Sequence, residues 1–180
     1  GGGSICRLEK GLLRVGPESA GAHPGPACYG FGGPLCLTDV NLLLGRLSTR
    51  HFSTPVFPEA SIERLHEIVE SSGRNTDELL QGFLTIANDA MANAIRKISM
   101  QQGYDPSDHA LVAFGGAGGQ HACGVADLLG MNRVILPADS GLLSAYGLSQ
   151  ARVERLVEHP VLRPLDSGII HDVEEQMIGN

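Results

Sequence analysis

Residues 110–129 constrain the fold more than any other segment, because they combine an apolar strand, a glycine loop and a helix. The strand is expected over Ala110–Phe114, the loop is Gly115-Gly116-Ala117-Gly118-Gly119, and the helix runs from about Gln120 to Leu129. Glycine lets the backbone turn tightly and approach a ligand, and the free N–H groups of a helix N-terminus attract anions. The unit therefore predicts a phosphate or nucleotide site, with a ligand-free strand–helix crossover as the alternative.

Two common nucleotide motifs do not fit this loop. No Gly-Lys-Ser/Thr follows it, so it is not a Walker A loop. The dinucleotide fingerprint fails as well, because its third glycine falls on His121. The position of His121 at the helix start leaves two interpretations open, a role near the ligand or packing and capping of the helix.

Further strands and helices alternate along the chain. Strands are expected at 12–15 and 134–136, and helices are expected near 38–45, 61–73, 75–98 and 140–152. Thr38 and Ser61 resemble helix N-caps, and Asn75 followed by Glu78 resembles a capping box. This alternation predicts an α/β fold with helices packed on a parallel or mixed sheet.

Residues 16–36 are too rich in glycine and proline for a helix or a central strand. A loop of this length is uncommon in a compact domain unless it has a function or is disordered. Its apolar and aromatic residues favour an ordered, functional loop.

Charge and composition exclude several classes of partner. The 180 residues carry a formal net charge of −7 and no basic stripe, which argues against nucleic acid and anionic membranes. No apolar run approaches the roughly 20 residues of a membrane span. The four cysteines form no C-x-x-C pair and are expected to be free buried thiols in a reducing cytosol.

Metal and nucleophile sites find little support in the residue spacing. The candidate metal ligands His23, Cys28, His51, His109 and His121 include no pair at recognisable ligand spacing, so we expect no metal site. The segment around Ser19 does not match the G-x-S-x-G nucleophile elbow, because position 17 is proline.

Three glycine-rich blocks together resemble the hydantoinase A domain of the ATP-dependent hydantoinase/oxoprolinase family. They read VGPESAGAHPGPACYG followed by GGP and LTDVNLLLGRL, then FGGAGGQHAC, then SGLLSAYGL. Their order also matches, and the GQHA sequence within the second block resembles the 5-oxoprolinase branch. The resemblance covers roughly residues 1–158 and implies that residues 159–180 begin a following C-terminal region.

The resemblance implies a partial lobe of the actin-like and Hsp70-like ATPases, a ribonuclease H-like fold with a mixed sheet and packed helices. Gly1-Gly2-Gly3-Ser4, which alone could be a linker remnant, would be the second phosphate turn. Residues 115–119 with Gln120 and His121 would contact the adenosine or the adjoining phosphate. The first phosphate turn would belong to an N-terminal lobe outside this chain, so we expect a fragment that is inactive alone.

The implied reaction is ATP-dependent opening of a cyclic amide such as 5-oxoproline or a hydantoin, by phosphorylation of the amide oxygen. Mg²⁺ would accompany the ATP, and a hydantoinase B-type subunit or domain would share the work in an oligomeric, cytoplasmic enzyme of glutathione metabolism. Glu18, Ser19, His23 and Asp39 are the polar candidates near the cleft. The alternatives are a subunit of an acetone-carboxylase-type enzyme and a non-catalytic nucleotide-binding or assembly segment.

Overall fold

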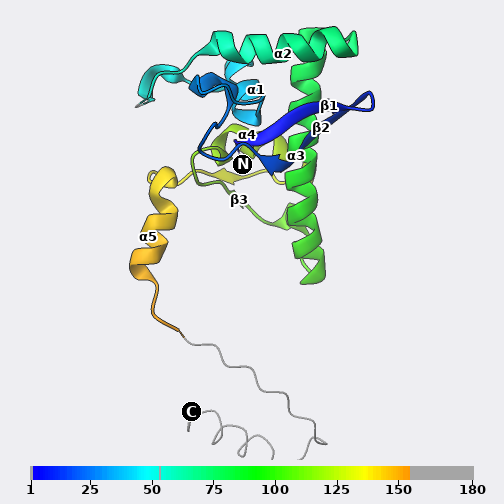
Figure 1. The fold of residues 1–180 in the computed structure, drawn as a ribbon. Helices are drawn as coiled ribbons and strands as arrows, with labels where there is room; N and C mark the ends of the chain where they lie inside the picture. The colour runs from blue at the N-terminus through cyan, green and yellow to red at the C-terminus, as the bar shows by residue number, and fades with distance from the viewer. Residues whose placement is uncertain (1, 53, 155–180) are drawn as a thin grey trace, which may run out of the picture. The chain divides into compact units, whose positions relative to one another are not determined.

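The computed structural model describes residues 2–52 and 54–154, in two compact units that meet after Ser144. The elements are β1 (Ser4–Glu9), β2 (Leu12–Ser19), η1 (Ala27–Tyr29), α1 (Leu37–Leu43), η2 (Thr49–His51), α2 (Pro58–Ser72), α3 (Thr76–Gln101), η3 (Pro106–Asp108), β3 (Leu111–Val112), α4 (Gly118–Leu129), β4 (Val134–Ile135), η4 (Ser140–Leu142) and α5 (Leu143–Gln150) (Figure 1). The expected boundary at residue 158 and the region 159–180 lie outside the described residues. None of the described helices is both long and apolar enough to cross a bilayer.

The α/β class is confirmed, with two small sheets. β1 and β2 form an antiparallel hairpin, whose turn places both Lys10 and Gly11 at positive φ, as two-residue hairpin turns require. β3 and β4 pair in parallel, with Leu111 opposite Val134. α1, α2 and α3 pack against the hairpin, and α4 packs against β4.

β2 continues to Ser19, so the prediction that the strand ends at residue 15 was wrong. The register shifts between Ser4 and Cys6, because β2 has extra residues there that form a bulge. Proline is tolerated in bulged or edge strands, where its missing N–H leaves no ladder bond unmade. Pro17 lies in this bulged part and therefore does not end the strand.

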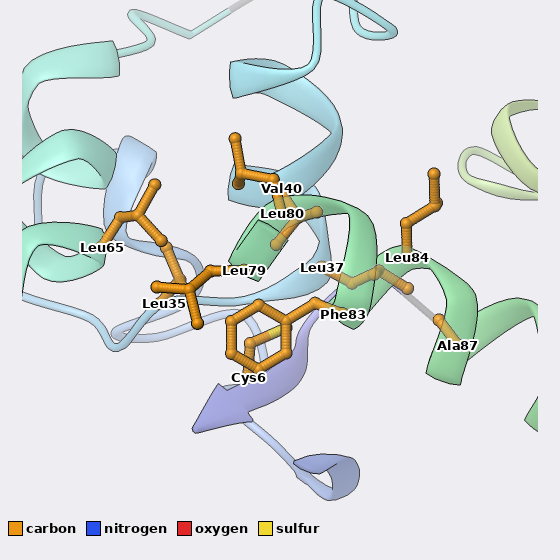
Figure 2. Packing of buried hydrophobic residues seen from close by; sticks show 10 residues of the cluster. All are labelled: Cys6, Leu35, Leu37, Val40, Leu65, Leu79, Leu80, Phe83, Leu84 and Ala87. Carbon is orange, nitrogen blue, oxygen red and sulfur yellow. The ribbon is translucent and has the colours of Figure 1, made fainter. Parts of the chain in front are cut away.

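α3 supplies the main core. Its buried face packs against the hairpin, α1 and α2, and Figure 2 shows the Phe83 ring beside Cys6 of β1. The buried members on α3 are Leu79, Leu80, Phe83, Leu84 and Ala87. A smaller cluster of Ala92, Val125 and Leu129 joins α3 to α4. The apolar residues of α3 therefore pack against the hairpin, α1 and α2 in the first half of the helix and against α4 further along.

Two of the three predicted helix caps were wrong. α1 begins at Leu37 after the N-cap residue Cys36, which leaves Thr38 inside the first turn. α2 begins at Pro58, because proline suits the first helical position, where its missing N–H costs nothing. The hydroxyl of Ser61 is used for a tertiary contact instead. Asn75 caps α3 with Glu78 as its capping-box partner, as predicted.

The second half follows the predicted order with shifted boundaries. β3 is shorter than the strand expected over 110–114, and α4 begins at Gly118, before the expected start at Gln120. α4 ends at Leu129, as predicted, and Gly130 follows it in the left-handed conformation. The helix expected over 140–152 is divided into η4 and α5, which ends at Gln150.

Candidate functional site

The N-terminal glycine turn lies directly before β1. The Gly2 carbonyl accepts a hydrogen bond from the Thr38 N–H at 2.9 Å, and the Gly3 carbonyl accepts one from the Ala20 N–H at 2.9 Å. A β-carbon on Gly2 would collide with Thr38 Oγ1, and one on Gly3 would lie 2.8 Å from Ser19 Oγ. Both glycines therefore permit a close approach that the fold itself requires. Gly1 lies outside the described residues.

The glycine loop at 115–119 connects β3 to α4. Gly115 has a φ of 86°, and its N–H donates to the Ser140 carbonyl at 2.8 Å. β-carbons on Gly116 and Gly118 would meet no heavy atom within 4 Å, and neither residue has a positive φ. Packing of the described residues therefore does not require glycine at these two positions. Gly116 and Gly118 leave open space beside the backbone.

The two glycine segments are neighbours in space. A β-carbon built on Gly2 would lie 3.8 Å from the Cβ of Ala117. The first residue of α4 is Gly118, so the free N–H groups of the helix lie next to the N-terminal turn. Backbone amides and the positive end of a helix together suit an anion.

An apolar hollow of about 300 Å³ lies beside the loop, between α3, β3 and α4. Ile95, Phe114 and Gly118 are among its lining residues, and His121 also borders it. A larger hollow of about 520 Å³ lies against β1 and α2, but it contains neither glycine turn. The smaller hollow is the one that adjoins the candidate site.

His121 is buried and uses both ring nitrogens. Nδ1 lies 2.9 Å from Asn88 Oδ1 on α3, and Nε2 lies 3.0 Å from Asn41 Nδ2 on α1. An amide oxygen only accepts and an amide nitrogen only donates, so Nδ1 carries the proton and Nε2 accepts. Burial, followed by the nearby positive charge of Arg46, lowers the pKa of His121. We call Asn41, Asn88 and His121 the amide–imidazole triad.

Asn41 has one further contact and one unused atom. Its Nδ2 also donates to the Leu37 carbonyl at 3.1 Å. Its Oδ1 is buried and has no hydrogen-bond partner among the described residues. A buried acceptor of this kind has a desolvation cost that an added donor would offset.

Arg46 brings a positive charge to the start of α4. Its Nη1 donates to the Gln120 carbonyl at 3.3 Å, although the side chain is exposed. The remaining guanidinium donors are therefore not consumed by this contact. Neither Arg46 nor the triad amides were singled out from the sequence. A polar Asn88 within the apolar stripe of α3 was the available signal for the triad.

Asp39 is fully buried and holds the glycine–proline segment together. Its Oδ1 accepts from the Cys28 N–H at 2.8 Å and from Ser61 Oγ at 2.7 Å. Its Oδ2 accepts from the Ala27 N–H at 3.1 Å and from the Cys36 N–H at 2.7 Å. Four hydrogen bonds occupy the lone pairs of the carboxylate. Asp39 therefore stabilises the segment between β2 and α1 and its contact with α2.

The other three polar candidates each have a local partner. Glu18 is exposed and pairs with Arg7 at 2.6 Å, and this hydrogen bond lowers the pKa of Glu18. Ser19 Oγ accepts from the Gly21 N–H at 3.2 Å, and the exposed His23 ring lies against Phe31. No hydrogen bond between described residues joins Glu18, Ser19, His23 and Asp39 to one another. Only Ser19 adjoins a glycine turn.

All four cysteines are free. Cys123 is exposed, so the prediction that all four thiols are buried was wrong for this residue. Burial raises the pKa of Cys28 and of Cys36 to about 12, and it raises the pKa of Cys6 further. In the part of the chain that the structure describes, no three His, Cys, Asp or Glu side chains are grouped as metal ligands.

Comparisons with known proteins agree on one family. A family model described as hydantoinase/oxoprolinase matches residues 1–157. The 5-oxoprolinase PfmaA of Pestalotiopsis fici is 47% identical over 168 residues, which are 86% of this chain and 13% of that protein. The structure of an ATP-dependent caprolactamase from Pseudomonas jessenii matches with a TM-score of 0.74 and 40% identity, over 82% of this chain and 22% of that one.

A second solved structure, nucleotide-free acetone carboxylase, also matches with a TM-score of 0.74. Its identity is 26%, over 84% of this chain and 22% of that one. The chain therefore spans less than a quarter of each of these relatives. The α/β fold with packed helices, predicted from the sequence and observed here with two small sheets, is shared with part of both structures.

Proposed function

The chain belongs to the hydantoinase/oxoprolinase family, and from this premise we propose that its two glycine turns bind ATP for the ring opening of a cyclic amide. The observation that carries the proposal is the adjacency of the turns, with Gly2 and Ala117 in near contact. Open space at Gly116 and Gly118 lets phosphate oxygens reach the backbone. The relatives named as 5-oxoprolinase and caprolactamase support a lactam as the substrate.

Each part of the proposed site has a separate task. The N–H groups at the start of α4 and the Gly2–Ser4 turn would bind phosphate oxygens, and Gln120 would lie at the same edge. The apolar hollow beside Phe114 offers a place for the adenine ring.

In the proposed reaction the amide oxygen takes the γ-phosphoryl group and ADP leaves. Water then adds to the activated carbon, and the C–N bond breaks as the nitrogen takes a proton, which leaves an acyl phosphate. A second water hydrolyses the acyl phosphate to the carboxylate and inorganic phosphate. Positioning and charge stabilisation would supply the catalysis.

The described side chains offer no set of ligands that would bind Mg²⁺ directly. The buried carboxylate of Asp39 is already used by four donors, and no acidic cluster adjoins the glycine turns among the described residues. Mg²⁺ bound by phosphates and water needs few protein ligands. No step proposed for this chain passes through the metal.

The acetone carboxylase match supports a second candidate, in which ATP activates a ketone or bicarbonate for carbon–carbon bond formation. Substrate-dependent ADP release by the full-length protein with its B-type subunit or domain separates the candidates. We expect release with 5-oxoproline, hydantoin or caprolactam. Release with acetone and bicarbonate alone would support the second candidate. Release with none of them, despite ADP binding, would leave a nucleotide-binding or assembly role.

The isolated 180-residue chain is expected to release no phosphate in the same assay. Phosphoryl transfer requires groups on both sides of the reacting atoms and exclusion of water, and the proposal assigns the opposing groups to another lobe. Loss of such positioning removes up to about 7–11 kcal/mol of barrier reduction. Turnover by the isolated chain would refute the two-lobe mechanism.

A further inference from the structure

The amide–imidazole triad links three helices that are distant in sequence. Asn41, on α1, precedes His121 by 80 positions, and Asn88, on α3, precedes it by 33. His121 is 3% exposed and Asn41 is 1% exposed, so both contacts are shielded from water. Buried hydrogen bonds of this kind hold their partners in a defined geometry.

Both ends of the Asn41–His121 contact lie one helical turn from a glycine turn. Thr38, three residues before Asn41, donates its N–H to the Gly2 carbonyl at 2.9 Å. Gly118, three residues before His121, is the first residue of α4. One turn of an α-helix spans about 5.4 Å. The side-chain contact therefore fixes the distance between the two backbone segments that the proposed function assigns to phosphate.

We propose that His121 is a positioning residue, which holds the 115–119 loop in register with the Gly2–Ser4 turn so that both reach one nucleotide. The proposal rests on the proposed nucleotide binding, and it assigns His121 no direct contact with the nucleotide. Both ring nitrogens are occupied by Asn41 and Asn88, so the residue acts through the backbone of α4.

Close packing of α3 against α4 supports this role. A β-carbon on Gly124 would lie 2.5 Å from Asn88 Nδ2, so glycine is what lets the amide sit against α4. Asn88 can then accept from Nδ1 and leave Nε2 aimed at Asn41. The contact with Asn88 on α3 therefore orients the imidazole ring, and this orientation allows Nε2 to accept from Asn41 on α1.

The first test measures ADP affinity by calorimetry, with Mg²⁺, in the full-length protein. His121→Leu removes both hydrogen bonds at similar volume. Leu65→Ala, which removes a buried core side chain of α2, is the control for general destabilisation. We expect His121→Leu to weaken ADP binding roughly 10- to 100-fold, and to speed hydrogen exchange at the amides of 115–119. Leu65→Ala should do neither. Equal affinity in the two variants would overturn the positioning role.

A second variant keeps the test valid if His121→Leu does not fold. Asn88→Asp preserves shape but places a carboxylate against Nδ1, which favours the imidazolium and puts a proton on Nε2, opposite Asn41 Nδ2. Turning the Asn41 amide to accept this proton would give up its bond to Leu37. Burial, followed by the positive charge of Arg46, lowers the pKa of the His121 ring. The side chains that contact the ring from α1 and α3, Asn41 and Asn88, are uncharged.

In Asn88→Asp we expect ADP affinity to fall as the pH decreases from about 8 to 6. Wild type, in which the pKa of His121 is lowered, should lose affinity only at lower pH. A purely structural role would change thermal stability with pH and leave the affinity of the folded protein unchanged. That result would overturn the inference but not the proposed function. Wild-type protein that binds no ADP would overturn both.

Discussion

Ser61 Oγ donates a 2.7 Å hydrogen bond to Asp39 Oδ1, which joins α2 to α1 through a buried carboxylate. The same carboxylate accepts three backbone N–H groups from the segment between β2 and α1. Asp39 was expected near the cleft as a polar candidate. Its four hydrogen bonds predict instead that replacing Asp39 mainly lowers the stability of the fold.

Asp39→Asn should destabilise the fold strongly. The substituted amide turns an N–H₂ group toward donors, so at least one buried N–H or hydroxyl loses its acceptor. Each buried unsatisfied group costs about 1–3 kcal/mol, and we expect a loss of about 3 kcal/mol or more in the free energy of unfolding. Urea denaturation monitored by circular dichroism measures it. Asp89→Asn, at an exposed site on α3, is the control and should change stability by no more than about 0.5 kcal/mol.

Gly118→Ala should raise stability and weaken nucleotide binding at once. A β-carbon at this position meets nothing within 4 Å, and replacing glycine by alanine at an unstrained position stabilises a fold by about 0.4–1 kcal/mol, because the unfolded chain has fewer conformations. The same methyl group would occupy the space proposed for a phosphate, and Gly118→Val should weaken binding further. Melting temperature and ADP affinity are the two measurements.

Thr85→Ala is the matched control for this pair, because it improves helix propensity at an exposed position of α3. It should raise stability without loss of ADP affinity. Unchanged affinity in Gly118→Val would identify the loop as a ligand-free crossover.

Protonation of His121 should make the fold less stable in acid. The pKa of His121 in the folded protein lies below its ordinary 6.5, so the unfolded chain binds a proton first as the pH falls. The free energy of unfolding should therefore decrease from about pH 6.5 down to the folded pKa, by at most about 1.4 kcal/mol per pH unit. Above pH 6.5 this contribution is fully present.

Urea titrations at pH 8, 7, 6 and 5 test this dependence, with His121→Gln as the comparison. Glutamine does not titrate, so the variant should lack this part of the slope. Parallel slopes in the two proteins would contradict the assignment of a neutral buried imidazole.

Cys123 should be the fast-reacting thiol of this chain. It is exposed, whereas Cys6, Cys28 and Cys36 are buried with raised pKa values. The thiolate is the reactive form, so at pH 8 the buried thiols should react only on unfolding. Alkylation followed by peptide mass mapping measures each cysteine separately. Cys123→Ser should remove the fast reaction, and rapid labelling of Cys28 in the native protein would contradict the buried geometry.

Local patterns predicted helices well and their first residues less well. Asn75 and Glu78 were recognisable because both halves of the capping box lie within four residues. Thr38 and Ser61 have the same chemistry as caps, but tertiary contacts decide their use. The backbone of Thr38 holds Gly2, and the hydroxyl of Ser61 binds Asp39. Such contacts cannot be read from neighbouring residues.

The candidate site was predictable as two glycine segments but not as a connected structure. The loop at 115–119 follows from strand and helix signals on either side. Its contact with Gly2 depends on how α1 and α4 pack, and that packing depends on the amides of Asn41 and Asn88. Single asparagines on long helices give no local signal of a partner so far along the chain.

The amide–imidazole triad has a consequence for the ionic conditions in which the protein works. Dissolved salt screens interactions between charges, over a Debye length of about 8 Å at physiological ionic strength. The exposed Arg7–Glu18 pair on the hairpin is subject to this screening. Asn41, Asn88 and neutral His121 carry no formal charge and are buried, so changes in ionic strength leave the link between α1, α3 and α4 intact.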